Sequence, residues 1–249
     1  MKAIILAAGR GSRMEEATED KPKCLISFAG KTLLEWQIKN LKSAGISQIG
    51  IVTGYCAKAL KFEDLNYFVN NEWNSTNMLC SMLCTREWLQ KETCIICYSD
   101  ILYPSVIISR LIVDTNDIAI TYDVNWMQLW SKRFKDPLLD AETFQVDESG
   151  FVTEIGNKTK IPQKIQGQYM GLIKITPMGF NKITRFLNTL EPEIIRKMDM
   201  TTLLRLLIRE GIRVHAIAVC EPWLEFDNPH DIDVYTLLLK EKSLDSLFI

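Results

Sequence analysis

Apolar residues gather in short runs along the first half of the chain, and segments of helical periodicity lie between them. Residues 3–8 form a run without any polar side chain, and residues 48–53 and 94–98 are similar runs that contain isoleucine. A strand buried on both faces of a parallel sheet shows such a continuous apolar run. Apolar residues recur at the spacing of one helix face over residues 33–41, and Gly45 then ends that helix. The pattern predicts βαβ units.

The alternation continues to the end of the chain. Further strands are expected at residues 66–70, 117–122, 168–175, 213–219 and 224–226. Further helices are expected at residues 78–83, 178–190 and 201–210, and two more begin at Pro104 and Pro229.

One segment in the second half departs from this pattern. Residues 126–164 contain charges, prolines and short alternating stretches, including a predicted hairpin of residues 143–147 and 151–155 around a Ser-Gly turn. We therefore predict an α/β fold: a Rossmann-like, mainly parallel but mixed sheet flanked by helices. It forms one domain, residues 1–249, in which residues 126–175 are a small insertion that carries the hairpin.

Composition and charge argue against some classes of binding partner, namely nucleic acids and membranes. The net charge of −2 gives no basic footprint for a nucleic acid. No apolar run approaches the roughly 18 residues of a membrane span, and the first strand begins at Lys2, which leaves no room for a signal peptide. The seven cysteines are an odd number, and Cys94 and Cys97 lie within a predicted strand. We expect buried free thiols and a cytoplasmic protein without nucleic-acid or membrane partners; a homo-oligomer stays open.

The segment most informative about chemistry runs from Leu6 to Met14 and is followed by Lys21-Pro22-Lys23. Glycines after a buried strand let backbone N–H groups turn toward a phosphate chain. The fork of an arginine suits the β- and γ-phosphates, and a lysine suits the α-phosphate. The segment is neither a Walker A loop nor a dinucleotide fingerprint, and a bare pair of glycines is usually an ordinary turn.

This LAAGxGxR stretch with its following KPK resembles the signature of the nucleoside-diphosphate-sugar pyrophosphorylase (nucleotidyltransferase) superfamily. The resemblance implies a GT-A-like fold and Mg²⁺-dependent transfer of a nucleoside monophosphate from an NTP to a phosphorylated acceptor, with release of pyrophosphate. Residues 1–125 would then be mainly the NTP-binding part, with Lys23 and Arg13 as catalytic residues. The nucleotide-binding residues that it implies are Leu6, Ala7, Ala8, Gly9, Gly11, Ser12, Arg13, Lys23, Gly54 and Tyr55.

Two carboxylates complete the expected reaction centre. Asp100 follows a predicted central strand and Asp227 follows a late one, and open α/β sheets bind ligands at such strand ends. Each alone is more often a helix cap. Both match positions of the superfamily's metal-binding aspartates, so the resemblance implies that they share a Mg²⁺ ion, with Asp100 also counted as catalytic.

Within the superfamily, the chain is most similar to small phosphocholine-type cytidylyltransferases. Asn77 and Ser81 match an N-x-x-x-S stretch of that group, and at helical spacing they would read a pyrimidine edge. The GxxxGTA-type and EKP segments of sugar-nucleotide members are missing. CTP is therefore the expected nucleotide. The alternatives are a sugar-1-phosphate nucleotidyltransferase that uses UTP, dTTP or GTP, and a non-catalytic nucleotide-binding regulatory subunit.

The acceptor is less specified. Trp126 and Trp130 are spaced to form an aromatic wall for a quaternary ammonium group, although such helical stripes are more often core. Glu142, with Asp140, is expected to bind an amino group or to be a solvated charge. The further acceptor-binding candidates are Lys158, Tyr169 and Gly171. Phosphocholine, 2-aminoethylphosphonate and phosphoglutamine stay open, and the implied product is a CDP-activated precursor of a surface polysaccharide or lipid.

Overall fold

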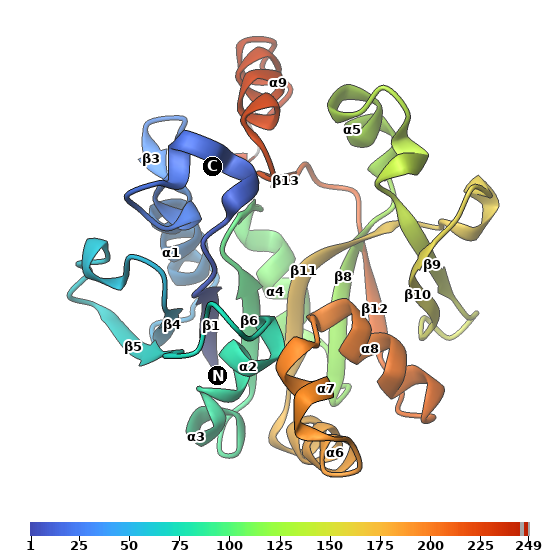
Figure 1. Ribbon diagram of the computed structural model, residues 1–249. Coiled ribbons are helices and arrows are strands. Elements are labelled where there is room, and N and C mark those ends of the chain that lie inside the picture. The colour runs from blue at the N-terminus through green and yellow to red at the C-terminus, as the bar shows by residue number, and fades with distance from the viewer. Residues whose placement is uncertain (245–246, 249) are drawn as a thin grey trace.

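A seven-stranded mixed sheet forms the centre of the computed structural model, which describes residues 1–244 and 247–248 (Figure 1). Its strand order is β12-β8-β11-β6-β1-β4-β5. The strands are β1 (Lys2–Ala7), β4 (Ile49–Thr53), β5 (Leu65–Val69), β6 (Cys94–Tyr98), β8 (Ile118–Asp123), β11 (Gln168–Ile175) and β12 (His215–Val219). Only the two pairings of β11 are antiparallel within this sheet, so the prediction of a mainly parallel but mixed sheet is confirmed.

Helices cover both faces of the sheet, which explains the uninterrupted apolar run of β1. Ile4 and Leu6 face one core, while Ala3 and Ile5 face the other, as the alternation along a strand requires. The first core is closed by α2 (Met78–Leu83), α3 (Arg86–Leu89), α6 (Pro177–Leu187) and α8 (Met200–Arg209). The second is closed by α1 (Leu33–Ser43), α4 (Ser105–Val113) and α5 (Trp126–Arg133).

A helix that the sequence did not predict, α7 (Pro192–Lys197), follows α6. The expected helix 178–190 ends at Leu187, and α7 is a separate short turn that begins with a proline. None of its residues is buried, so it leaves no apolar period in the sequence.

The predicted hairpin is confirmed as β9 (Glu142–Val146) paired antiparallel with β10 (Val152–Lys158). It stands beside the main sheet together with α5, and α8 packs on it (Figure 1). The insertion is shorter than 126–175, because residues 168–175 are β11 and lie inside the main sheet between β8 and β6. The segment outside the sheet is therefore 126–167.

The C-terminal segment returns to the middle of the molecule. There β13 (Leu224–Glu225) pairs with β7 (Ile101–Leu102), and α9 (Pro229–Lys240) follows. A third core of aromatic and aliphatic side chains packs beneath α9, around Phe226 and Tyr235. The remaining elements are β2 (Ser27–Phe28), β3 (Lys31–Thr32) and 3₁₀ turns at Ser12–Thr18, Lys23–Leu25, Ala57–Ala59, Pro137–Leu139 and Pro162–Lys164.

Two expectations from composition can be compared with this fold. All seven cysteines are free, and Cys94 and Cys97 are buried as expected, which raises the pKa of both thiols to about 12. Cys84 and Cys220, in contrast, are exposed. Among the helices of the described residues, none combines the length and the apolar character that crossing a membrane requires.

Candidate active site

The loop after β1 lies at the carboxyl edge of the sheet, beside the end of β6, because β1 and β6 are parallel neighbours. Gly11 has a φ of 68°, in the left-handed region that favours glycine. A Cβ atom at this position would lie 3.0 Å from the Cβ atom of Lys23, so glycine gives the lysine stem room to pass.

A cavity of about 260 Å³, which we name the loop cavity, opens at this loop. It is lined by Leu6, Gly9, Gly11, Ser12, Arg13, Lys23, Met78, Ser99 and Asp100. Ala7 and Ala8 are buried beside it. The structure thus brings most of the expected phosphate-binding residues to one cavity, together with one of the two expected acids.

Lys23 is buried and joins the two acids. Its Nζ atom donates to Asp100 Oδ2 at 2.7 Å and to Asp227 Oδ1 at 3.3 Å. Burial alone would lower the pKa of Lys23, but the charges of Asp100 and Asp227 outweigh it and raise that pKa above its usual value. The ammonium group therefore stays charged between two carboxylates.

Asp227 is held in place by the local structure of the C-terminal segment. The N–H of Phe226 donates to the carbonyl of Asp100 at 2.9 Å, which ties the two aspartate-bearing segments together. Asn228, and not Asp227, is the cap of α9, and it forms a capping box with Asp231. The Asp227 side chain is therefore available to the site, where it accepts from Arg13 Nη2 at 2.6 Å.

The surrounding charges act on Asp227 more strongly than its burial does. Burial would raise the pKa of Asp227, but Lys23, Arg13 and Arg133 hold it below its usual range. Arg13 itself is largely exposed, with 70% of its side chain accessible. It can therefore move toward a phosphate without leaving a buried position.

The donor set of Asp100 and Asp227 fits a divalent cation of the magnesium type. No cluster of three or more potential ligands of the His, Cys, Asp or Glu type occurs among residues 1–244 and 247–248. Mg²⁺ usually takes one or two carboxylates and completes its shell with substrate phosphates and water. Two carboxylates beside the glycine loop meet that requirement.

A second cavity of about 360 Å³, the insertion cavity, lies between the main sheet and the insertion. Its lining carries four carboxylates, namely Asp140, Glu142, Glu225 and Asp227. Arg13 lines both cavities, so they meet at the Arg13–Asp227 pair. A group bound in the insertion cavity can therefore approach one bound in the loop cavity.

Tyr98, Tyr169 and Gly171 line the sheet side of the insertion cavity. The pairing of β11 with β8 is irregular between Tyr169 and Ile173, and Gly171 there has a φ of 77°. A Cβ atom on Gly171 would lie 2.7 Å from the Tyr98 ring. The hydroxyl of Tyr169 is buried, and the centroid of its ring lies 5.8 Å from that of the Tyr98 ring.

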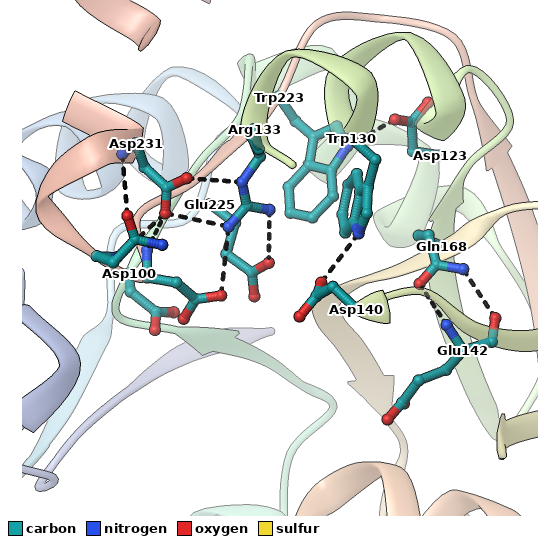
Figure 2. A network of polar contacts seen from close by, with 12 residues as sticks. Asp100, Asp123, Trp130, Arg133, Asp140, Glu142, Gln168, Trp223, Glu225 and Asp231 are labelled. Atoms are coloured by element: carbon teal, nitrogen blue, oxygen red, sulfur yellow. Dashed lines mark hydrogen bonds and ion pairs between the residues drawn. The ribbon is translucent and has the colours of Figure 1, made fainter. Parts of the chain in front are cut away.

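The two tryptophans differ in position. Trp130 lines the insertion cavity, and its Nε1 atom donates to Asp140 Oδ2 at 2.9 Å (Figure 2). Trp126 is packed in the core, and its Nε1 atom donates to the carbonyl of Ile165 at 3.3 Å. The expected aromatic wall is therefore corrected: both tryptophans pack in the second core, and only Trp130 also lines the cavity.

Glu142 and Lys158 lie at the outer part of the insertion cavity, on the paired strands β9 and β10. The Lys158 Nζ atom lies 3.6 Å from Glu142 Oε1 and donates to the carbonyl of Asp140 at 2.9 Å. Both side chains are substantially exposed. The cavity therefore presents acidic groups along its wall and one lysine at its rim.

Asn77 and Ser81, which were expected to share one helix face and to read a pyrimidine edge, have other partners in the structure. Asn77 is the cap residue of α2, where its Oδ1 atom accepts from the N–H of Met78 and its Nδ2 atom donates to the carbonyl of Lys197. Ser81 is buried and accepts from Asn70 Nδ2 at 3.1 Å. Internal hydrogen bonds therefore engage both side chains that were expected to read the base.

Gly54 and Tyr55 lie beside the loop after β1, as expected for a border of the nucleotide site. The N–H of Tyr55 donates to the carbonyl of Ala8 at 2.9 Å. Trp73, which the sequence did not single out, packs so closely on Gly54 that a Cβ there would lie 2.6 Å from it. Its ring centroid lies 5.3 Å from that of Tyr55. The sequence feature that could have drawn attention to Trp73 is that it is an isolated tryptophan in a polar segment.

Sequence reasoning also missed Glu225 and Arg133. Burial, followed by the charge of Asp227, raises the pKa of Glu225 above its usual value, although Arg133 opposes this rise. The Arg133 side chain is fully buried against Glu225 and Asp231 (Figure 2). It also pairs with Asp227. An arginine in the last turn of an amphipathic helix gives no sign in the sequence that it points inward.

Comparisons with known proteins identify the family of the chain. Residues 3–150 match the model of the MobA-like NTP transferase domain. The chain is 34% identical over 250 residues to a CTP:phosphoglutamine cytidylyltransferase of Campylobacter jejuni, an alignment that covers 94% of this chain and 98% of that protein. It is 39% identical over 93 residues to a choline-phosphate cytidylyltransferase of Streptococcus pneumoniae, which covers 36% of this chain and 41% of that protein.

Among solved structures, the fold is similar to that of a CTP:phosphocholine cytidylyltransferase from Streptococcus pneumoniae. The TM-score is 0.74 at 21% sequence identity, and the match covers 96% of this chain and 98% of that chain. At this identity the match supports the fold and leaves the substrate to the residues of the site.

Proposed function

The chain belongs to the MobA-like NTP transferase family and is a nucleotidyltransferase, and we propose that it transfers CMP from CTP to a small phosphorylated acceptor of the phosphoglutamine type. One observation carries the proposal: Lys23 joins Asp100 and Asp227 next to the Arg13–Asp227 pair, where two cavities meet. The full-length similarity to a phosphoglutamine cytidylyltransferase supports the choice of nucleotide and acceptor class.

The loop cavity would hold the triphosphate. Backbone N–H groups around Gly9 and Gly11, with the guanidinium group of Arg13, suit the β- and γ-phosphates. Lys23 suits the α-phosphate, since its ammonium group lies at the Asp100 end of the same cavity. Both basic groups pair with carboxylates in the free protein, so a bound triphosphate would compete for them.

Asp100 and Asp227 would hold a Mg²⁺ ion. When bound, this ion supplies charge neutralisation on the phosphates and orients them. The chain's own contribution is the geometry of the two carboxylates and the positive charge that Lys23 brings to the α-phosphate.

The reaction then needs little acid–base chemistry. A phosphate oxygen of the acceptor forms a bond to the α-phosphorus of CTP, and the bond from that phosphorus to the bridging oxygen of the β-phosphate breaks. Pyrophosphate leaves with the bonding electrons, and the attacking oxygen is already anionic, so no proton has to be removed from it. Lys23 offsets charge on the α-phosphate and Arg13 offsets charge on the pyrophosphate.

The insertion cavity would hold the acceptor. Its carboxylates, Asp140, Glu142 and Glu225, suit an ammonium group, and Lys158 at the rim suits a carboxylate. An acceptor that carries both charges matches this arrangement better than a neutral sugar phosphate does. The product would be a CDP-linked compound, of the kind used as an activated precursor for a surface polysaccharide or a lipid.

Pyrophosphate release measured with Mg²⁺ tests this proposal. CTP, UTP, GTP, ATP and dTTP would each be paired with phosphoglutamine, phosphocholine, 2-aminoethylphosphonate and glucose 1-phosphate. We expect release with CTP, and fastest with phosphoglutamine. Turnover only with a sugar phosphate would assign the chain to sugar-nucleotide synthesis, and CTP binding without turnover on any acceptor would indicate a regulatory subunit.

A further inference from the structure

Arg133, the last residue of α5, carries a fully buried guanidinium group surrounded by three carboxylates (Figure 2). Its Nε atom lies 2.9 Å from Asp231 Oδ1, and its Nη2 atom lies 3.1 Å from Asp231 Oδ2. Nη2 also lies 3.3 Å from Asp227 Oδ2, and Nη1 lies 3.2 Å from Glu225 Oε2. All three nitrogens of the group are therefore used.

The two oxygens of Asp227 have different partners. Oδ1 faces the reaction centre, where it accepts from Arg13 and Lys23. Oδ2 faces away from them and accepts from Arg133. Arg133 thus holds the back of the carboxylate while its front is available to the site, and the bidentate contact with Asp231 fixes Arg133 itself.

Asp231 gives this arrangement a rigid base. It is fully buried at the start of α9, and its Oδ2 atom accepts from the N–H of Asp227 at 2.7 Å. The backbone and the side chain of Asp227 are therefore both held by one pair of residues, Asp231 and Arg133. The planar fork of an arginine reaches three carboxylates through three separate nitrogens and binds one of them bidentately, whereas a lysine has only one nitrogen for such contacts.

Arg133 also contacts Trp130, which lines the insertion cavity. Its guanidinium carbon lies 5.0 Å from the centroid of the Trp130 ring, and Trp130 donates to Asp140 in the cavity wall. Arg133 belongs to the insertion, whereas Asp227 and Asp231 belong to the C-terminal segment. A single side chain thus connects the wall of the proposed acceptor site to a carboxylate of the reaction centre.

We propose that Arg133 is a positioning residue: it fixes the Asp227 carboxylate for the reaction and couples it to the insertion that lines the acceptor site. This role rests on the proposed function. In the proposed reaction Arg133 contacts neither the phosphates of CTP nor the acceptor. It acts only through Asp227, Glu225 and Trp130.

The test compares Arg133→Lys with Arg110→Lys. Arg110 also forms a bidentate pair with a carboxylate, that of Glu221, but neither residue lines the two cavities. Four quantities are measured for each variant: the midpoint of thermal unfolding, the Kd for CTP without metal, kcat, and the Kd for Mn²⁺ in the presence of CTP, followed by electron paramagnetic resonance.

For Arg133→Lys we expect about a 10- to 100-fold loss in kcat and in Mn²⁺ affinity, because residues that orient a metal ligand have effects of this size. The Kd for CTP without metal should stay within about twofold, because the loop cavity does not contain Arg133. Arg110→Lys should leave all three binding and rate constants unchanged. Wild-type kcat and Mn²⁺ affinity in a folded Arg133→Lys variant would overturn the proposal.

A second variant covers the case in which Arg133→Lys does not fold. Asp231→Asn keeps the size of the side chain and an acceptor oxygen, but removes the charge that holds Arg133. It should lower Mn²⁺ affinity in the same direction, and an unchanged affinity would contradict the positioning role. If the wild-type protein released no pyrophosphate, the proposed function would fail, whereas Mn²⁺ binding would still decide the role of Arg133.

Discussion

The ammonium nitrogen of Lys23 lies between the carboxylates of Asp100 and Asp227, at 2.7 Å from an oxygen of the first and 3.3 Å from an oxygen of the second. In the proposed reaction, the same two carboxylates hold a divalent cation. Lysine and metal therefore compete for one place in the free protein, and a triphosphate that draws Lys23 away would favour metal binding. This relationship makes nucleotide and metal binding mutually dependent.

Removal of Lys23 tests this competition. Lys23→Ala should bind Mn²⁺ several-fold more tightly than the wild-type protein when no nucleotide is present, because the carboxylates have lost their internal cation. The same variant should lose about 10²- to 10³-fold in kcat, the usual effect of removing a group that neutralises transition-state charge. Electron paramagnetic resonance and pyrophosphate release measure the two effects.

A surface lysine provides the control for that experiment. Lys42 forms an exposed ion pair with Asp64, so Lys42→Ala removes a similar charge away from both cavities. It should change neither Mn²⁺ binding nor turnover. Equal Mn²⁺ affinities for Lys23→Ala and the wild-type protein would contradict the competition.

Asp100 is expected to determine the response to metal. In Asp100→Asn the side chain keeps its size but loses the charge that attracts a hard cation. The Mg²⁺ concentration that gives half-maximal turnover should rise at least about tenfold, as for other lost ligands or their partners. A Mg²⁺ titration of turnover at saturating CTP measures this, and a wild-type titration curve would remove Asp100 from the metal site.

The two tryptophans of α5 form a matched pair for the acceptor site. Trp130→Phe removes the N–H that holds Asp140 at 2.9 Å, so the KM for the acceptor should rise about fivefold, equivalent to about 1 kcal/mol for a lost hydrogen bond. Trp126→Phe removes a bond to a core carbonyl instead and should lower stability only. Steady-state kinetics of both variants measures the acceptor KM. Equal effects of the two substitutions on this KM would contradict the assignment of Trp130 to the acceptor site.

Alanine substitutions at Gly171 and Gly211 distinguish the cost of a strained backbone from the cost of a steric clash. Both have positive φ angles, but a Cβ on Gly171 would meet the Tyr98 ring at 2.7 Å, whereas none of the described atoms lies within 4 Å of one on Gly211. Gly211→Ala should reduce the free energy of unfolding by about 1–2 kcal/mol. Gly171→Ala should lose about 1–3 kcal/mol more. Urea unfolding measures both, and equal losses would show that Tyr98 moves aside freely.

Local patterns were sufficient to predict most of the fold. The apolar run of β1, the periodicity of α1 and the alternating hairpin each report burial that one segment experiences along its own length. The segment 126–175 was assigned too broadly, because strand pairing is not encoded locally: β11 pairs with two strands that lie far from it in sequence. Short elements without buried residues, such as α7, left no pattern at all.

The sequence was sufficient to predict that several candidate site residues lie close together. The glycine loop, Lys23 and Asp100 line one cavity because parallel strands end at the same edge of the sheet. Whether a side chain faces a cavity or the core depends on packing between distant segments. Trp126 and Trp130 share a helix and a residue type, yet only Trp130 lines the cavity, and Arg133 was indistinguishable from a surface arginine.

The most direct test of the central claim follows the α-phosphate of CTP. The protein would be incubated with Mg²⁺, phosphoglutamine and CTP labelled with ³²P at either the α- or the γ-position. We predict that the α-label appears in a CDP-linked product and the γ-label in pyrophosphate. A γ-label in the acceptor product, or an α-label that stays in CTP with every acceptor, would contradict transfer of CMP by this protein.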